Sequence, residues 1–335
     1  MNGWRQKTLA VCLGLAGALA CGEVVMRIVG APEVAPVRRG RFQLSANPRL
    51  LFEPVPHLKY HGDPTEFYEY TGQSNSLGFR DREHTVAKPP GTYRIAILGD
   101  SIAAGYRIER TEDAFPARLE ALLRAAGLPV EVLSFAVTGY NTEQEVETLR
   151  VRALQFDPDL VLLAYCHNDR RPPDPRILEL LREAKGNRNV VPPLSEADRF
   201  LTHSALYRFI RYGVFQAKDR KKEAAAEAQG ENTVERSLQE LAQISRQEAF
   251  PVLLAVFPYL PQPYDRQHSQ QHDWLASIAQ REGLHYLDLR PAFRDCGPPL
   301  DELRFDRYHP TAAGHACAAA AMSNAVRQII QEKPR

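Results

Sequence analysis

Five short apolar runs recur along the chain, and amphipathic stretches separate most of them. Continuous apolar runs of four to eight residues predict buried parallel strands, whereas apolar residues at every third or fourth position predict covering helices. The predicted strands are Arg94–Leu98, Glu131–Phe135, Leu160–Ala164, Val252–Phe257 and Leu284–Asp288, and the predicted helices are about 113–126, 142–154, 268–282 and 312–330. Strands that alternate with helices predict an α/β domain with a parallel sheet covered on both faces.

One long interruption breaks this alternation between residues 170 and about 232. It is too long for an ordinary loop in a compact domain, so we expect a helical insertion there. Apolar side chains recur at helical spacing inside it: Leu206, Phe209, Ile210 and Val214. This stripe has three open interpretations, namely a helix packed on the core, a cap that lines an acyl pocket, or a face that contacts the membrane.

The N-terminus has a basic and then apolar pattern. Arg5 and Lys7 precede an apolar stretch from Leu9 to Gly30 that only Glu23 and Arg27 interrupt. The pattern is typical of an export signal, and about 20 apolar residues are needed to span the bilayer core. Glu23 and Arg27 lie four residues apart on one helical face, where they can pair or extend toward the headgroups. We expect a single-pass cell-membrane anchor with the rest of the chain outside the cytoplasm.

Two other fates of residues 1–30 stay open. Ala18-Leu19-Ala20 provides small residues for signal cleavage, which would give a secreted protein cut near Ala20. Lipidation of Cys21 is less favoured, because the residues before it match a lipoprotein signal poorly. The following residues, 31–90, are rich in Pro and Arg without a sustained period, and are interpreted as a spacer and an N-terminal extension that packs on the main domain.

Composition narrows the functional classes. The 335 residues are 44% hydrophobic and 25% charged, which is ordinary for a globular chain, and the net charge of +1 gives no electrostatic reason to expect nucleic acid. Outside the export segment the cysteines are Cys166, Cys296 and Cys317, without C-x-x-C spacing. The odd total of five cysteines argues against a fully paired set, and neither a disulfide framework nor a zinc site is expected.

A serine and a histidine at two predicted chain turns have the chemistry of nucleophilic catalysis. Ser101 directly follows the first predicted strand, at the sheet edge where ligands bind in open α/β folds. A serine hydroxyl needs a base, and His309 is the best candidate among the ten histidines. Asp306, three residues earlier, can fix the imidazole tautomer that leaves the other nitrogen facing Ser101. These three residues are the predicted catalytic triad.

Attack on a carbonyl creates an oxyanion, which fixed hydrogen-bond donors stabilise. Two candidates follow the next two strands. Gly139 can present its backbone N–H without a side chain in the way, and Asn168 can offer its side-chain amide. The backbone N–H of Ser101 is the third predicted donor.

This set of residues resembles the SGNH/GDSL hydrolase family, of the exported, membrane-anchored bacterial type. The match consists of Gly99-Asp-Ser101, Gly139 before Tyr-x-Thr, Asn168-Asp169 and Asp306-x-x-His309, in order from about Tyr93 to Ile330. The resemblance implies a three-layer flavodoxin-like SGNH fold with about five parallel strands in residues 91–335. It also extends to residues 75–80, Asn-Ser-Leu-Gly-Phe-Arg, which look like a segment of exported bacterial members.

Two positions depart from the family pattern. Ile102 stands where leucine is usual after the nucleophile, which is a conservative change. Cys166 stands where the family usually has glycine before x-Asn-Asp, and its Cβ is expected to affect the Asn168 loop and the oxyanion geometry. The Gly-x-Ser-x-Gly elbow of α/β-hydrolases is absent around Ser101, which argues against that fold.

Three functions fit these residues. The leading hypothesis is a carboxylic ester hydrolase that forms an acyl-enzyme on Ser101, with no cofactor and no metal. The second is an O-acyltransferase that passes the acyl group to an envelope glycan or lipid from the same site. The third is a binding protein that has kept the fold and lost activity. The expected partners are an ester substrate, either a lipid or an acylated glycan, and the membrane through the N-terminal helix.

Overall fold

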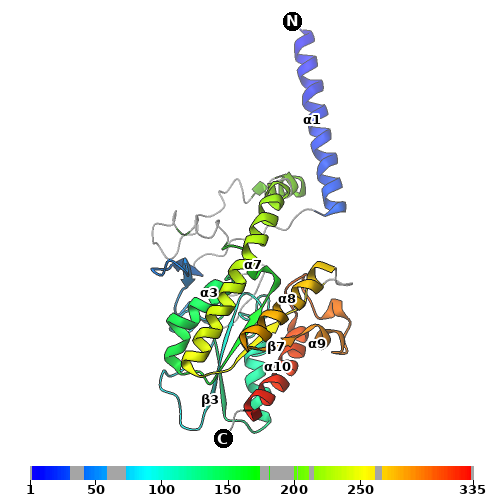
Figure 1. The fold of residues 1–335 in the computed structure, drawn as a ribbon. Helices are drawn as coiled ribbons and strands as arrows, with labels where there is room; N and C mark the ends of the chain where they lie inside the picture. Colours follow the sequence, from blue (N-terminus) through cyan, green and yellow to red (C-terminus); the bar gives the residue numbers. More distant parts are fainter. Residues whose placement is uncertain are drawn as a thin grey trace. The chain divides into compact units, whose positions relative to one another are not determined.

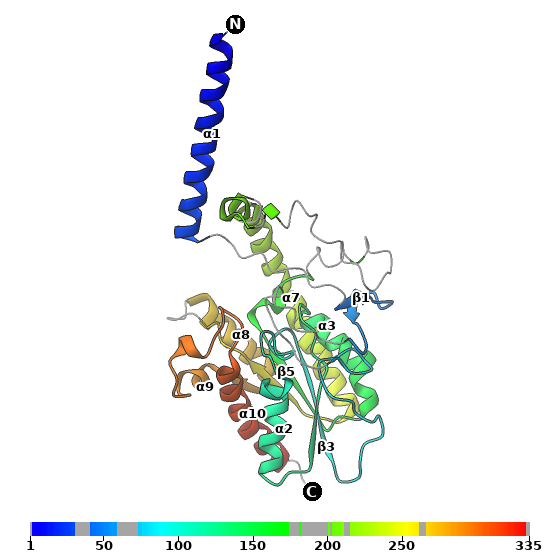
Figure 2. The ribbon, with the colours of Figure 1, turned by 180° about the vertical axis from the view of Figure 1, so that it is seen from behind.

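The computed structural model describes residues 2–30, 41–58, 73–173, 181, 200–201, 203–210, 215–260 and 266–332 (Figures 1 and 2). The chain divides into two compact units, of which the first combines Met1–Arg39 with Val190–Ala225 and the second combines Gly40–Asn189 with Ala226–Arg335. Val214 of the predicted apolar stripe lies outside the described residues.

A five-stranded parallel sheet forms the centre of the second unit. Its strands are β3 (Tyr93–Gly99), β4 (Val130–Ser134), β5 (Leu160–Tyr165), β6 (Val252–Val256) and β7 (His285–Asp288). The order across the sheet is β4-β3-β5-β6-β7, which is the flavodoxin-like arrangement. The predicted fold class is therefore confirmed, and the predicted strands agree with the observed ones to within about one residue at each end.

Helices cover both faces of this sheet. One face packs against α2 (Phe115–Ala125) and α10 (Ala312–Glu332), which lie side by side in Figure 2. The other face packs against α3 (Thr142–Thr148), α8 (Arg266–Glu282) and the buried side of α7 (Phe215–Glu248), as in Figure 1. Successive residues of β3 enter the two different cores because neighbouring side chains of a strand point to opposite faces.

Helix α7 runs without interruption through the expected end of the insertion near residue 232. Its later turns bury Val234, Leu238, Leu241 and Ala242 at helical spacing in the sheet core. Gly230 begins this buried part, and a Cβ there would collide with the carbonyl oxygen of Arg170. The glycine thus permits the helix to pack directly on the chain that follows β5.

The N-terminal extension packs on the same unit. It forms a small antiparallel hairpin of β1 (Phe42–Leu44) and β2 (Phe52–Pro54). Phe52 is fully buried, and its ring meets those of Phe42 and Tyr140 edge to face at 5.1 Å in each case. This part of the extension therefore belongs to the hydrophobic core of the second unit.

The first unit contains α1 (Asn2–Val29) and α6 (Ala205–Arg208). In the described part of the chain, α1 is the one helix that is long and apolar enough to cross a membrane, by length and composition. Its large apolar side chains, from Trp4 to Val29, are exposed. The same features fit a signal sequence.

Candidate active site

The structure brings Ser101, His309 and Asp306 together. The Oγ atom of Ser101 lies 2.9 Å from Nε2 of His309, and Nδ1 of His309 lies 2.8 Å from Oδ2 of Asp306. Ser101 is buried, whereas the side chain of His309 is 16% exposed, so the base is accessible from solvent. This is the arrangement that a serine nucleophile requires: the Asp306 carboxylate orients the His309 ring, and Nε2 of His309 faces the Ser101 hydroxyl.

Ser101 is placed by the end of β3 at the point where the strand order reverses. β3 pairs with β4 on one side and with β5 on the other, and such a switch point opens a crevice beyond the strand ends. Gly99 closes the strand, where a Cβ would lie 2.7 Å from the Cβ of Ala103. The carbonyl oxygen of Ser101 then accepts a hydrogen bond from the Tyr106 N–H at 2.8 Å, which closes the turn that follows the strand.

Asp306 organises the loop that carries the base. Its Oδ1 atom accepts from the backbone N–H groups of Tyr308 and His309, each at 2.9 Å, in addition to the imidazole contact. Burial alone would raise the pKa of this carboxyl, but the hydrogen bonds and the charge of His309 outweigh burial and lower the pKa of Asp306 to about 2. Asp306 is therefore ionised at any pH at which a histidine base is neutral.

A disulfide brackets this loop. Cys296, which follows α9 (Arg290–Arg294), bonds to Cys317 in α10, with 5.8 Å between the two Cα atoms. The 21-residue separation encloses both Asp306 and His309. This bond was not predicted, because the spacing of its two cysteines is not diagnostic of a disulfide.

Asn168 lies in a short 3-10 helix, His167–Arg170, directly after β5. Its Nδ2 donates to Oδ2 of Asp100 at 3.1 Å, and the Ser101 hydroxyl lies 3.0 Å from the same oxygen. The fully buried Asp100 thus holds the Asn168 amide beside Ser101. A donor fixed in this way costs no reorganisation when negative charge develops nearby.

Gly139 lies in a tight turn after β4, with φ of +85°, a conformation that glycine adopts without strain. The Tyr140 N–H closes the turn on the Val137 carbonyl at 3.1 Å. Asn141 then caps α3 and donates through Nδ2 to the Arg171 carbonyl at 3.2 Å. This bond ties the end of the Gly139 turn to the end of the Asn168 turn, although the role of Gly139 as an oxyanion donor stays a prediction.

Cys166 has an ordinary backbone conformation, with φ of −113° and ψ of 150°, so a Cβ fits at this position without backbone strain. Its N–H donates to Oδ2 of Asp169 at 2.9 Å, which closes the turn that carries Asn168. Burial raises the pKa of the Cys166 thiol well above its ordinary value, and the nearby Asp100 and Asp169 raise it further. The buried Cys166 thiol is thus a poor candidate for a nucleophile.

Arg80, in the N-terminal extension, was not predicted as part of the site, yet it supports the turn that follows Ser101. Its guanidinium donates to the carbonyl oxygens of Ala104, Gly105, Ile108 and Glu109 at 2.6 to 3.2 Å. The turn also carries Tyr106, whose ring centroid lies 4.3 Å from that of His309. Arg80 is the last residue of the 75–80 motif, which resembles a segment of exported family members. The motif alone does not predict which part of the chain Arg80 contacts.

A family model described as "GDSL-like Lipase/Acylhydrolase family" matches residues 97–317, about two thirds of the chain. The chain belongs to this family.

Solved structures that resemble this GDSL-family chain do so at low sequence identity. "Crystal Structure of TesA" is 16% identical, covers 70% of this chain and 99% of its own, and has a TM-score of 0.46. LAE5, an α/β hydrolase enzyme from the metagenome of Lake Arreo, Spain, is 18% identical, with 71% and 96% covered and a TM-score of 0.45. The psychrotrophic esterase EstA from Pseudoalteromonas sp. is 13% identical, with 71% and 99% covered and a TM-score of 0.43. A comparison with curated proteins gives no match.

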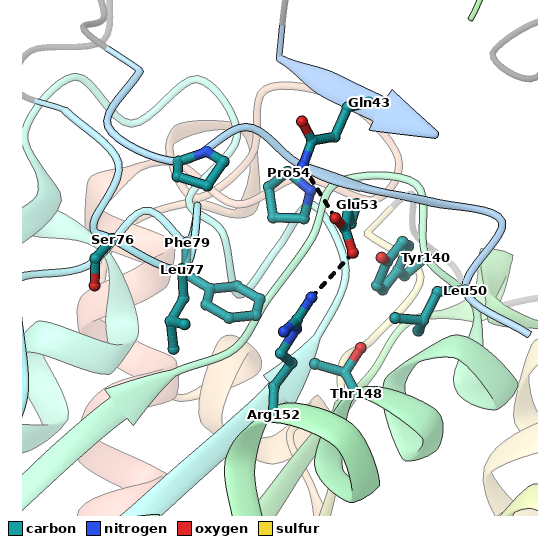
Figure 3. Close-up of a pocket in the computed structure, with 11 residues that line it drawn as sticks. Gln43, Leu50, Glu53, Pro54, Ser76, Leu77, Phe79, Tyr140, Thr148 and Arg152 are labelled. Carbon is teal, nitrogen blue, oxygen red and sulfur yellow. Dashed lines mark hydrogen bonds and ion pairs between the residues drawn. The ribbon is translucent and has the colours of Figure 1, made fainter. Parts of the chain in front are cut away.

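A small cavity of about 90 Å³ lies away from the triad of this GDSL-family chain (Figure 3). The N-terminal extension and the first turns after Gly139 line it, and Glu53 bridges Gln43 and Arg152 inside it. Tyr140 borders the cavity and donates through its hydroxyl to the Phe52 carbonyl at 2.5 Å. The cavity therefore belongs to the packing of the extension behind the Gly139 turn.

Two further histidines have structural contacts. His315 is fully buried and accepts from the Phe115 N–H through Nδ1 at 3.1 Å, and burial lowers its pKa to about 3. The Nδ1 of His167 lies 2.5 Å from Oε1 of Gln271 in α8, and burial lowers the pKa of His167 to about 3. Both imidazoles are therefore neutral at physiological pH and act as packing and hydrogen-bonding groups.

Replacement of Arg80 by methionine is expected to lower kcat for a small nitrophenyl ester by roughly 100-fold, with little change in KM. The reason is that a shift of the turn by about 1 Å would misplace the Ser101 hydroxyl. Arg80→Lys is expected to recover only part of the loss, since one ammonium cannot span four carbonyl groups. The matched control is Arg82→Met, which removes an exposed ion pair to Glu120. Steady-state kinetics on variants with native circular dichroism test this, and equal kcat values for all three would contradict it.

Proposed function

We propose that this GDSL-family ester hydrolase works as a serine esterase that forms an acyl-enzyme on Ser101. The supporting observation is the 2.9 Å contact between the Ser101 hydroxyl and Nε2 of His309, with Asp306 bonded to the opposite nitrogen. The substrates are carboxylic esters, either a lipid or an acylated glycan.

The reaction proceeds in two halves. Nε2 of His309 takes the hydroxyl proton while Oγ of Ser101 bonds to the ester carbonyl carbon, whose oxygen becomes negatively charged. The carbonyl re-forms as the carbon–alkoxide bond breaks, and His309 returns the proton to the departing alcohol. Water then gives its proton to His309 and attacks the acyl carbon, and the bond to Oγ breaks as Ser101 recovers its proton and the acid leaves.

The three oxyanion donors are the N–H groups of Ser101 and Gly139 and the amide of Asn168. Replacement of Asn168 by alanine is expected to lower kcat by roughly 10²- to 10³-fold, since one preorganised donor is lost. Asn141→Ala is the comparison variant, because it loosens the two turns without removing a donor. Hydrolysis rates of acetyl and longer nitrophenyl esters measure the effect, and an Asn168→Ala variant with unchanged kcat would remove this residue from the site.

The proposed location is the cell membrane, with α1 as a single-pass anchor and the second unit outside the cytoplasm. Two observations support it: the apolar side chains of α1 are exposed, and Cys296 and Cys317 form a disulfide, which persists in oxidising compartments. Secretion after cleavage near Ala20 would equally deliver the disulfide to such a compartment. Resistance of the full chain to alkaline carbonate extraction distinguishes the anchored form from the cleaved one.

A serine-directed fluorophosphonate tests the chemistry directly. The proposal predicts a single covalent adduct on Ser101, found by mass spectrometry of the labelled peptide, and none in Ser101→Ala. Release of free acid from an ester in the presence of glycan acceptors supports hydrolysis, whereas faster formation of acylated acceptor supports acyl transfer from the same site. A folded chain that takes no label would be the binding protein without catalysis.

A further inference from the structure

Glu23 and Arg27, the two charged residues near the end of α1, both contact one short segment of the first unit. Oε2 of Glu23 accepts from the Ser204 hydroxyl at 2.6 Å and from the Leu206 N–H at 3.0 Å, while Oε1 accepts from the Ala205 N–H at 3.0 Å. Ser204 is also the N-cap of α6. Glu23 therefore satisfies the free N–H groups at the start of α6, which explains a carboxylate in an apolar helix.

Arg27 completes this attachment. Its Nε pairs with Oε1 of Glu23 at 2.8 Å, and its Nη2 donates to the His203 carbonyl at 3.3 Å. Gly22 leaves room on the same helix face, since a Cβ there would lie 3.0 Å from Cδ2 of Leu206. The start of α6 is thus fixed to the last two turns of α1 by polar bonds and by close packing.

The position of Glu23 along α1 sets the depth of this attachment. Trp4 lies beside Arg5 and Lys7, and aromatic and basic residues of this kind mark the cytoplasmic boundary of a bilayer. Glu23 is 19 residues further along, and at about 1.5 Å per residue the separation is roughly 28 Å. The hydrocarbon core of a bilayer is about 30 Å thick. Glu23, and α6 with it, would therefore lie at the outer boundary of the hydrocarbon.

Large apolar side chains flank this attachment and are not covered by the described residues. Their exposed fractions are 78% for Phe200, 41% for Leu201, 39% for Phe209 and 51% for Ile210. Backbone bonds connect the first two to the fixed segment, because the N–H groups of His203 and Ser204 donate to the carbonyls of residues 200 and 201 at 3.2 and 3.0 Å. Exposed apolar side chains in one short segment are unfavourable in water and favourable at a lipid boundary.

We propose that residues 200–201 and 203–210, the interfacial segment, insert these apolar side chains into the outer leaflet of the bilayer beside α1. The partner is the boundary between lipid headgroups and acyl chains. Glu23 and Arg27 hold the segment at that depth. The membrane contact therefore consists of the spanning helix α1 and a short segment beside it at the lipid interface. The inference rests on the proposed anchoring by α1 and is independent of the chemistry at Ser101.

Fluorescence quenching in vesicles tests the contact. The two native tryptophans, Trp4 and Trp274, are replaced by phenylalanine, and Phe209→Trp is introduced into the full chain reconstituted in phosphatidylcholine vesicles. The inference predicts blue-shifted emission and loss of most of the intensity when the lipids carry bromine near the headgroup end of the acyl chain. Val151→Trp in the same background is the matched reference, since Val151 is 38% exposed on the second unit.

The other results overturn the inference. If acrylamide but not brominated lipid quenches the Phe209→Trp fluorescence, the segment lies in water. If neither quencher acts, the segment is covered by other parts of the protein. Equal lipid quenching of the Val151→Trp reference assigns the contact to the whole protein and not to this segment. Sedimentation with vesicles in carbonate shows separately whether α1 is anchored, and its failure would remove the proposed location together with the segment.

A second variant tests the role of Glu23. Glu23→Ala in the Phe209→Trp protein is expected to lose the lipid quenching while the protein still sediments with the vesicles. Hydrolysis of a soluble nitrophenyl ester is expected to be unchanged, because no residue of the triad is altered. Unchanged quenching in Glu23→Ala would show that the attachment to α1 does not position the segment.

Discussion

Replacement of Ser101 by alanine is expected to lower kcat for a nitrophenyl ester by roughly 10⁴- to 10⁶-fold. The physical reason is the loss of the nucleophile: His309 remains in place, but it has only water to activate. The remaining donors still bind the ester, so KM is expected to change little. Stopped assays with high enzyme concentration measure the residual rate.

Ser237→Ala is a matched control for this variant. Ser237 is a buried serine of α7 whose hydroxyl donates to the Thr233 carbonyl at 2.8 Å, far from the triad along the chain. Its replacement also removes one buried hydroxyl, and kcat is expected to stay at the wild-type value. A Ser101→Ala protein that retains more than about a hundredth of the activity would contradict the nucleophile assignment.

Replacement of Asp306 by asparagine is the second large effect, with an expected loss of roughly 10⁴-fold in kcat. The carboxylate accepts from Nδ1 of His309, which leaves Nε2 free to take the serine proton. An asparagine amide can donate to Nδ1 and so favour the tautomer with the proton on Nε2, which cannot act as the base. The position of the His309 ring is therefore kept, but its proton is on Nε2, where the ring cannot accept the Ser101 proton.

The rate of fluorophosphonate labelling of Ser101 measures this loss independently of turnover. Asp301→Asn is the control, because Asp301 is an exposed carboxylate of the same loop, paired with Arg304, and touches no member of the triad. Labelling at the wild-type rate is expected for Asp301→Asn. If Asp306→Asn is labelled equally fast, another group must orient His309.

Much of the second unit was predictable because its elements are local in sequence. The buried strands are short apolar runs, and the chemistry-bearing residues follow their carboxyl ends, where a parallel sheet brings them to one edge. Ser101 and Asn168 could therefore be expected near each other from the order of their motifs along the chain. Helix α7 beyond residue 232 was missed although Val234, Leu238 and Leu241 recur at helical spacing.

The contacts that were not predicted join residues far apart in sequence. Arg80 reaches Glu109 across 29 positions, and Glu23 reaches residues more than 180 positions away. Such pairs leave no periodic pattern, because each partner has many sterically possible alternatives along the chain. The capping role of Glu23 also explains why a charge interrupts the apolar helix, a feature for which the sequence suggested pairing with Arg27 or extension toward the headgroups.

The Cys296–Cys317 bond makes the order of the loop that carries Asp306 and His309 depend on the redox conditions around the chain. In a reducing cytosol two such cysteines stay as thiols, and the loop lacks this constraint. Oxidation links two residues 21 positions apart on either side of Asp306 and His309, a constraint that the chain-entropy account values at about 3 kcal/mol. For an exported chain, as proposed above, this constraint would be added to the Asp306–His309 loop only in an oxidising compartment.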